Sequence, residues 1–250
     1  MGNNRAFIYG DLLFETIRKT DGKINYASLH ANRLKVGAEL LGISLPGNWS
    51  TAYFVELLDK LVLEKNARVR LVMYRQGNGF YLPSGNDALF SVESWPLPEP
   101  KSDLTKVGVY QLQYKSCCSL SNLKSGNALI YVMAAKYAKE NGFEDVLILN
   151  QHQRIAEANS SNVFWVKDEK IYTPPLSEGP VAGIMREAVL QFALSNGILI
   201  EEKPLEIKEL EVADEFFLTN VLHGIVSVSE FNKKKLGNKT SSLLKKGLVI

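Results

Sequence analysis

The sequence predicts an α+β protein of two domains, and three observations support that fold class. The chain is 250 residues long, which is enough for one large domain or two modest ones. Helix-like and strand-like segments mingle without the regular β–α–β alternation of a parallel sheet. A polar stretch rich in Ser, Cys and Asn lies near 115–122. We therefore expect a small N-terminal α+β domain at 1–115, a linker at 116–121 and a larger C-terminal domain at 122–250.

The composition narrows the class of function. Hydrophobic residues make up 46% and charged residues 22%, which is ordinary for a soluble globular protein, and the formal charge of +2 favours neither nucleic acid nor an acidic membrane as a partner. No signal-like segment follows Met1 and no apolar run is long enough to span a bilayer, so we expect a cytoplasmic protein. The three histidines are far apart, and we expect no metal site. Because neighbouring side chains point apart, we expect no structural disulfide at Cys117-Cys118.

The N-terminal third contains two helix-like and several strand-like segments. Ala6 to Arg18 mixes aromatic and β-branched residues around Gly10-Asp11, which predicts a strand bent by a turn or bulge. The Asp-Gly pair at 21–22 predicts a hairpin turn. Apolar spacing predicts a helix over 26–41 that ends at Gly42, with an apolar stripe on one face. The members of this stripe are Leu29, Leu34, Val36, Leu40 and Leu41.

Further elements follow the same patterns. We expect a helix over 51–65 and strands over 67–74, 88–94 and 106–114, after which the polar stretch ends the first domain. The proline-rich run at 96–100 is typical of a rigid spacer. In the second domain we expect a helix from Asn127 to Gly142, a helix over 184–196 and a short helix over 207–211. The expected strands there are 145–149, 154–166, 198–203 and 215–219.

A lone lysine comes just before the helix that starts near Asn127. Lys124 lies in the segment NLKSGN, at the position where a helix dipole is positive. That field and burial both disfavour the ammonium form, so a nucleophilic amine is one interpretation of this residue. The alternative is an ordinary surface lysine.

A lone acid lies in the middle of a strand-like run. The neighbours of Glu157 in RIAEANSSNVFWV are strongly apolar, so an ionised carboxylate there needs a cation or several hydrogen-bond donors. A protonated pyridine nitrogen would meet that need and would make a pyridine-containing cofactor an electron sink. The alternative is a pair with an arginine across the sheet. The run NSSN that ends at Asn162 adds small hydrogen-bonding side chains beside the acid.

A third feature is suited to bind phosphate. The chain enters a helix at Gly183, where the unpaired N–H groups of a helix start bind phosphate and glycine allows close approach. Arg33 lies three residues after His30 on the same helix face, and its guanidinium is a suitable partner for the same phosphate. Each of these features also has a plain structural interpretation, since every helix has an N-terminus and most arginines lie at the surface.

An ordered set of segments resembles the class IV aminotransferases, the fold-type IV pyridoxal phosphate enzymes. This family holds branched-chain aminotransferases, D-amino acid aminotransferases and aminodeoxychorismate lyases. The similarity covers nearly the whole chain. The segments are YGDLLFETIR, LHANRL, NLKSGNALIYVMA, IAEANSSNVFWV, YTPPL, GIMRE and ADEFFLTNVLHGI.

The resemblance implies a fold, a cofactor and residue roles. It implies a two-domain D-amino acid aminotransferase-like fold with pyridoxal 5′-phosphate between the domains, and a homodimer whose pockets border the partner subunit. Lys124 matches the lysine that holds the cofactor as a Schiff base, and Glu157 matches the acid at the pyridine nitrogen. The implied phosphate partners are Arg33, the Ile184-Met185 helix start and the loop that contains Asn220 and Val221.

Departures from the family pattern bear on the substrate. Gly10-Asp11-Leu12 replaces the usual Gly-Asp-Gly, and little chain precedes it. Transaminases commonly carry threonine at the position of Met185 and a Ser/Gly-Thr pair at Asn220-Val221, whereas Gly-Ile-Met-Arg and Thr-Asn are more similar to the aminodeoxychorismate lyases.

The leading hypothesis is therefore a lyase that releases pyruvate and p-aminobenzoate, a folate precursor, from 4-amino-4-deoxychorismate. A transaminase of branched-chain or D-amino acids and a non-catalytic relative that binds or acts as a scaffold are the alternatives. We expect substrate contacts at Phe14, Arg75 and Tyr81, the latter two from charge and position.

Overall fold

The structure is a computed structural model that describes residues 4–101, 103–104 and 106–248. The chain divides into two compact units that differ from the expected domains. Unit 1 comprises Met1–Glu99 and Leu123–Asn127, and unit 2 comprises Pro100–Asn122 and Ala128–Ile250. The first change of unit therefore falls inside the proline-rich spacer, and the lysine-bearing segment belongs to the N-terminal unit.

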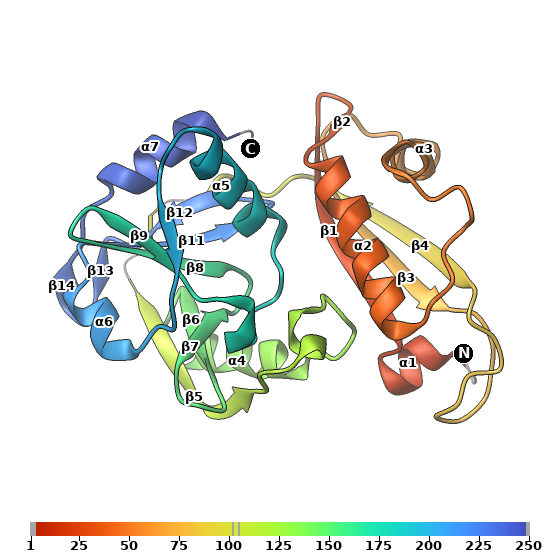
Figure 1. The fold of residues 1–250 in the computed structure, drawn as a ribbon, viewed down its shortest axis with the longest axis horizontal. Coiled ribbons are helices and arrows are strands. Elements are labelled where there is room, and N and C mark those ends of the chain that lie inside the picture. Colours follow the sequence, from red (N-terminus) through yellow and green to blue (C-terminus); the bar gives the residue numbers. More distant parts are fainter. Residues whose placement is uncertain (1–3, 102, 105, 249–250) are drawn as a thin grey trace. The chain divides into compact units, whose positions relative to one another are not determined.

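Unit 1 is a four-stranded antiparallel sheet in the order β2-β1-β3-β4, with α2 and α3 packed on one face (Figure 1). Alternate side chains of β1 and β3, such as Leu13, Ile17 and Leu71, are buried against these helices because successive strand residues point to opposite faces. The elements are α1 (Arg5–Tyr9), β1 (Leu12–Thr20), β2 (Lys23–Ile24), α2 (Ala27–Leu41), α3 (Thr51–Leu61), β3 (Ala67–Arg75) and β4 (Ala88–Trp95).

Local signals set most of these boundaries. Asp21 and Gly22 both have positive φ, at 50° and 77°, and they connect β1 to β2 as the Asp-Gly pair predicts. Gly42 ends α2 in the left-handed conformation, with φ 64°. Helix α3 ends at Leu61, four residues before the expected end, where the backbone of the buried Val62 becomes extended.

Two expectations for unit 1 are wrong. Residues 5–9 form the short helix α1 rather than the start of a strand, because Asn4 caps its first turn and Gly10 closes it at φ 64°. The expected apolar stripe of α2 is also incorrect, since Val36 and Leu40 are exposed. The helix instead buries Leu34 of the expected stripe together with His30, Ala31, Gly37 and Ala38.

The segment Leu123–Asn127 is attached to the beginning of β1. The carbonyl of Lys124 accepts the N–H of Phe14 at 2.8 Å, and Ser125 forms an antiparallel bridge with Leu13. One residue further on, the N–H of Gly126 donates to the carbonyl of Leu12 at 3.2 Å. These contacts make the segment a short extra edge of the unit 1 sheet.

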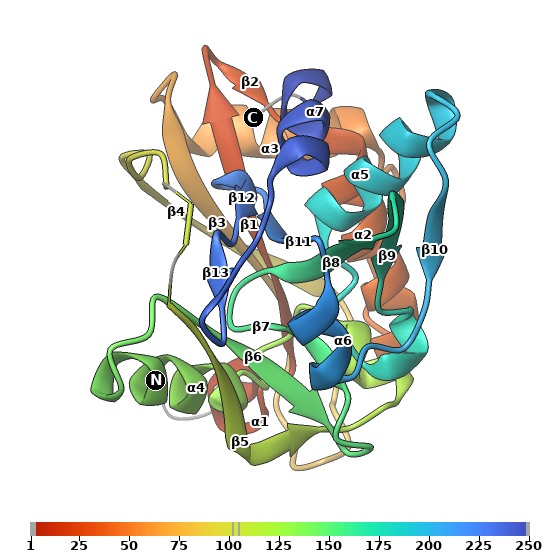
Figure 2. The same cartoon turned by 90° about the vertical axis from the view of Figure 1, so that its left-hand side faces the viewer.

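Unit 2 contains two layers of sheet enclosed by helices (Figure 2). A five-stranded sheet has the order β10-β9-β8-β11-β12, and a three-stranded sheet has the order β5-β6-β7. The elements are β5 (Val107–Lys115), η1 (Ser119–Asn122), α4 (Leu129–Glu140), β6 (Asp145–Asn150), β7 (Ile155–Ala158), β8 (Asn162–Lys167), β9 (Lys170–Thr173), η2 (Leu176–Glu178), α5 (Ile184–Ser195), β10 (Ile200–Glu202), α6 (Ile207–Val212), β11 (Glu215–Asn220), β12 (Gly224–Ser227), β13 (Glu230–Phe231), β14 (Lys234–Lys235) and α7 (Lys239–Gly247).

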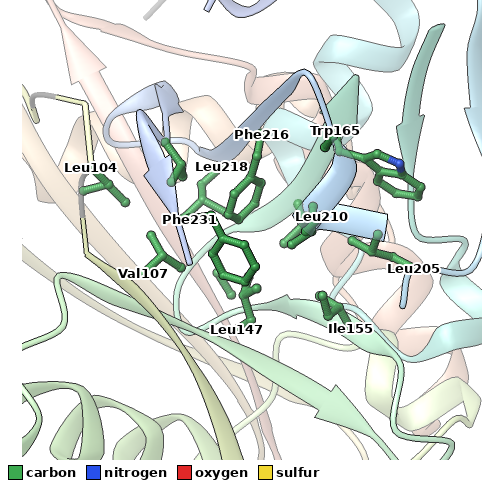
Figure 3. Close-up of a cluster of buried hydrophobic side chains, with 14 of the residues drawn as sticks. Leu104, Val107, Leu147, Ile155, Trp165, Leu205, Leu210, Phe216, Leu218 and Phe231 are labelled. Atoms are coloured by element: carbon green, nitrogen blue, oxygen red, sulfur yellow. The ribbon is translucent and has the colours of Figure 1, made fainter. Parts of the chain in front are cut away.

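The main core of unit 2 lies where the two sheets face each other. Val107, Leu147 and Ile155 come from the three-stranded sheet, and they meet Trp165 and Phe216 from the five-stranded sheet (Figure 3). The opposite face of the five-stranded sheet packs against α5 and α7, and the opposite face of the three-stranded sheet packs against α4. Apolar side chains on both faces of the strands explain their nearly continuous burial.

The expected strand over 154–166 is two strands in different sheets. β7 ends at Ala158, whose N–H donates to the carbonyl of Ser161 at 2.8 Å, and this tight turn directs the chain into β8. β5 pairs in parallel with β6, so it belongs to unit 2 rather than to the first domain. Helix α4 is capped by Ala128, one residue after the expected cap, with no side-chain hydrogen bond.

Candidate active site

The amine of Lys124 lies against an aromatic ring of unit 1. Its Nζ is 4.6 Å from the ring centroid of Phe14, which lies on the face of β1 opposite the buried Leu13. The ring attracts an ammonium ion. Lys124 is part of the extended segment beside β1, and α4 begins only at Leu129, so the expected placement at a helix start is wrong.

Three arginines share that open face of the sheet. Arg18 of β1 lies opposite Arg68 of β3, and Arg70 lies opposite Thr16. The guanidinium carbons of Arg68 and Arg70 are 5.8 Å and 5.2 Å from the ring centroid of Trp95 on β4. The sequence analysis missed this cluster, although the alternation in ARVRLVMY puts both β3 arginines on one face.

A buried ion cluster lies on the opposite side of β1. The carboxylate of Glu15 accepts a hydrogen bond from Nε of Arg33 at 2.7 Å, a second from its Nη2, and lies 2.5 Å from Nδ1 of His30. Burial alone would raise the pKa of Glu15, but the charges and hydrogen bonds of Arg33 and His30 outweigh it and lower that pKa to about 2. Burial lowers the pKa of His30. Arg33 of α2 thus contacts β1, the strand before its helix, through Glu15.

Two expected substrate residues have other contacts. Arg75 is 7% exposed, and all three of its guanidinium nitrogens donate hydrogen bonds. It binds Asp11 and the carbonyls of Leu41 and Gly42, so its guanidinium lies at the end of α2. Tyr81 is 88% exposed in the loop between β3 and β4, and its ring lies 5.5 Å from that of Tyr9.

In unit 2, Glu157 is the centre of a buried polar cluster. Its Oε1 accepts hydrogen bonds from the ammonium of Lys115 and from the hydroxyl of Tyr131, the latter at 2.6 Å. Its Oε2 accepts the N–H of Val181 at 3.0 Å. The expectation that Glu157 lies among buried apolar residues is confirmed, but its cation is Lys115 rather than an arginine. Lys115 is distant in sequence and has no local motif, so sequence reasoning missed it.

The start of α5 lies in close contact with the side chain of Asn162. Gly183 caps this helix without a side-chain hydrogen bond. Nδ2 of Asn162 donates to the carbonyl of Val181 at 2.8 Å, and a Cβ added at Gly183 would lie 1.8 Å from Oδ1 of Asn162. Ile184 and Met185 follow as buried residues of the first turn.

The end of β11 lies beside the start of β8, whose Asn162 contacts Gly183 at the start of α5. Thr219 is paired with Asn162 across the β11–β8 ladder, and its buried hydroxyl has no hydrogen-bond partner among the described residues. The side chain of Asn220 donates to the hydroxyl of Ser161 at 2.9 Å and accepts N–H groups from the following turn. Val221 is the first residue of that turn and is half-buried.

These residues suit the pyridoxal phosphate that the sequence resemblance implies. Glu157 offers a buried carboxylate for a pyridine nitrogen, and the start of α5 offers backbone donors for a phosphate. The orphaned hydroxyl of Thr219 is a further donor that a phosphate would satisfy.

Within the described ranges, no group of three or more His, Cys, Asp or Glu residues could hold a metal ion, and no helix could cross a membrane.

Comparisons with known proteins agree on one family. The family model described as amino-transferase class IV matches residues 12–231. Aminodeoxychorismate lyase from Vibrio harveyi is 28% identical over 232 residues, which cover 90% of this chain and 85% of the relative. A putative branched-chain-amino-acid aminotransferase from Methanocaldococcus jannaschii is 29% identical over 248 residues, covering 94% and 84%. The crystal structure of a putative 4-amino-4-deoxychorismate lyase from Legionella pneumophila has a TM-score of 0.86 at 24% identity and covers 99% of this chain and 95% of its own.

Proposed function

Since the chain belongs to the class IV aminotransferase family of pyridoxal-phosphate-dependent enzymes, we propose that it is a 4-amino-4-deoxychorismate lyase. The proposed reaction releases pyruvate and leaves p-aminobenzoate, a precursor of folate. A family aminotransferase that acts on branched-chain or D-amino acids is the second candidate, and the similarity to the archaeal branched-chain relative favours it. Both candidates begin with proton removal beside the substrate amine, so they require the same cofactor residues.

The observation that carries the lyase proposal is the arginine cluster on the open face of the unit 1 sheet. 4-Amino-4-deoxychorismate carries two carboxylates, whereas a branched-chain amino acid carries one. Arg18, Arg68 and Arg70 provide three guanidinium groups on the face where the Lys124 amine lies. Glu93 is paired with Arg70 across the β3–β4 ladder. A guanidinium group can donate two parallel hydrogen bonds to one carboxylate, so this face suits a substrate with two carboxylates.

The start of α5 also supports the lyase. The threonine that transaminases commonly carry after Gly-Ile is here Met185, which is 1% exposed and has no hydroxyl to donate. Met185 therefore adds no side-chain donor to the backbone N–H groups of the first turn of α5. This matches the lyase-like Gly-Ile-Met-Arg pattern in the sequence.

In the proposed site, each residue of the chain has a separate task. The Lys124 amine would hold the cofactor and would move the substrate proton. Glu157 would hold the pyridine nitrogen through its carboxylate, and the start of α5 and the Asn220 turn would hold the phosphate. Arg33, which the sequence resemblance assigns to the phosphate, donates its Nε and Nη2 to Glu15. The bound cofactor supplies an electron sink for the electrons left by the departing proton. The ring of Phe14 holds the lysine chain against the sheet.

The test is an assay with enzymatically generated 4-amino-4-deoxychorismate and no keto-acid acceptor. The lyase releases pyruvate and p-aminobenzoate in equal amounts. Transfer of an amino group to 2-oxoglutarate or pyruvate, without release of p-aminobenzoate, would instead establish the transaminase. An Arg70→Gln variant should raise KM for the dianion at least tenfold. Lys136→Gln is the control, because the Lys136 side chain is 65% exposed.

We also propose that the enzyme is a cytoplasmic homodimer. Unit 2 exposes several large apolar side chains on and near α4, and exposed apolar patches commonly mark subunit interfaces. The most exposed of them are Leu112, Leu120, Leu129 and Val132. Light scattering on the purified protein should give twice the mass of the 250-residue chain, and a monomer mass at micromolar concentration would refute this proposal.

A further inference from the structure

Lys115 is a buried charge that the proposed reaction does not use. Its side chain is 6% exposed, and its ammonium donates to Oε1 of Glu157, to the hydroxyl of Tyr131 at 2.6 Å and to the carbonyl of Ser121 at 3.3 Å. An ammonium has three N–H donors, so these three contacts use all of them. The side chain is therefore fixed in position and its charge is directed at one carboxylate.

Tyr131 completes a closed ring of hydrogen bonds. Its hydroxyl accepts from Lys115 and donates to the same Oε1 of Glu157. Burial first, and then the charge of Glu157 and the hydrogen bond to it, raise the pKa of Tyr131, so the phenol stays protonated and remains a donor. Oε1 thus has two donors, and the N–H of Val181 takes one of the two acceptor positions of Oε2. One position on Oε2 is left for a further donor.

We propose that Lys115 is a positioning residue that weakens the hold of Glu157 on the ring nitrogen of the cofactor. The inference rests on the proposed function, in which Glu157 binds that nitrogen. The Lys115–Tyr131 pair directs the nitrogen to Oε2, and the ammonium neutralises the carboxylate before the cofactor arrives. A protonated ring nitrogen of the cofactor is then a second positive charge beside the Glu157 carboxylate.

The direction of the effect follows from the charges. Without Lys115, the buried carboxylate has no counter-ion among its described contacts, and a protonated ring nitrogen supplies the missing charge. With Lys115 present, the same nitrogen adds a positive charge to a neutral pair. Charges a few ångströms apart inside a protein interact by several kcal/mol, which is larger than the gain from one neutral hydrogen bond. Lys115 therefore reduces the share of binding that depends on the ring nitrogen.

The test compares pyridoxal phosphate with 1-deazapyridoxal phosphate, in which carbon replaces the ring nitrogen. Both bind apoprotein through the same phosphate and aldehyde, so the ratio of their dissociation constants isolates the nitrogen contact. Lys115→Met and Lys115→Gln should each raise the preference for pyridoxal phosphate by about tenfold. Lys115→Arg keeps the charge and should retain the wild-type preference. A role in folding alone would weaken both ligands equally and leave the ratio unchanged.

Two neutral variants keep the test decisive if one of them fails to fold. An unchanged or smaller preference in the neutral variant that folds overturns the inference, as does an increase in Lys115→Arg equal to that in Lys115→Met. Glu157→Gln separates this inference from the proposed function, because it should remove most of the wild-type preference. If Glu157→Gln keeps that preference, Glu157 does not bind the nitrogen, and both its proposed role and the inference about Lys115 are wrong. If it loses the preference while the neutral Lys115 variants match the wild type, only the inference about Lys115 is wrong.

Discussion

Lys124 and Phe14 are joined twice, once through the backbone and once through their side chains. The N–H of Phe14 donates to the carbonyl of Lys124 at 2.8 Å, and the Lys124 amine lies 4.6 Å from the centre of the Phe14 ring. The backbone bond sets which strand face the lysine occupies, and the ring holds its amine there. A residue in a plain extended segment thereby receives a defined position from the strand beside it.

The covalent role of Lys124 predicts a loss of colour. Lys124→Ala should leave a folded protein that binds pyridoxal phosphate without the visible absorbance of the lysine-bound cofactor. Borohydride treatment should then attach no cofactor to the chain. Lys136→Ala is a matched control because its side chain is 65% exposed and its ion pair is with Glu140 in the same helix. Persistence of the visible band in Lys124→Ala would show that another lysine carries the cofactor.

The Glu15 cluster predicts an acid-sensitive contribution to stability. The pKa of Glu15 is lowered from 4.5 to about 2, so the unfolded chain takes up this proton first as the pH falls. The carboxylate therefore stabilises the fold above pH 4.5, and this contribution is lost between pH 4.5 and 2. At neutral pH it amounts to about 3 kcal/mol.

Urea unfolding of Glu15→Gln across pH 7 to 3 measures this contribution. The variant should be less stable than the wild type by about 3 kcal/mol at pH 7, and the difference should narrow below pH 4.5. Glu56→Gln is the control, because Glu56 is 64% exposed and pairs with Lys60 on the surface of α3, where ion pairs contribute little. A difference that stays constant down to pH 3 would contradict the assigned ionisation.

The unpaired hydroxyl of Thr219 predicts opposite effects on the apoprotein and on cofactor binding. Thr219→Val removes a buried hydroxyl that has no partner among the described residues, so the apoprotein should be as stable as the wild type or more stable. Affinity for pyridoxal phosphate should fall by about tenfold because a phosphate donor is lost. Thr173→Val is the contrast, since its hydroxyl donates to the carbonyl of Val163 at 2.8 Å, and its apoprotein should lose about 1 kcal/mol. Equal stability losses in the two variants would refute the idea.

The contact at Gly183 predicts that an added methyl group damages the phosphate site. Gly183→Ala would place a Cβ 1.8 Å from Oδ1 of Asn162, and this side chain must then move and lose its hydrogen bond to Val181. Isothermal titration with pyridoxal phosphate should show at least a tenfold weaker affinity. Gly47→Ala is the matched control, because a Cβ there meets nothing within 4 Å. Wild-type affinity in Gly183→Ala would exclude close approach of a ligand to this helix start.

Local patterns predicted the parts of the fold that depend on neighbouring residues. The Asp21-Gly22 turn and the Gly42 cap follow from the local chemistry of glycine and its neighbours. Local signals can also compete, as at α1, where the caps at Asn4 and Gly10 overrule the strand preference of the apolar residues between them.

Contacts between segments that are distant in sequence could not be predicted from local sequence patterns. Lys115 meets Glu157 across 42 residues of chain, and no spacing rule pairs them. Arg75 was assigned to the substrate by its charge, yet its partners are the last carbonyls of α2, which only the folded sheet brings near. The turn at Ala158 likewise sends one apolar run into two sheets, a choice that alternation alone does not reveal.

Because Leu123–Asn127 belongs to unit 1, unit 1 is encoded by two separate stretches of the gene. Pro100–Asn122, which contains β5 and belongs to unit 2, is synthesised before Lys124. The unit 1 sheet therefore gains Lys124 only after this part of unit 2 has been made. A gene fragment that stops at Glu99 encodes Glu15 and Arg33 but lacks Lys124. A single recombination at Glu99 would therefore separate the lysine from its sheet.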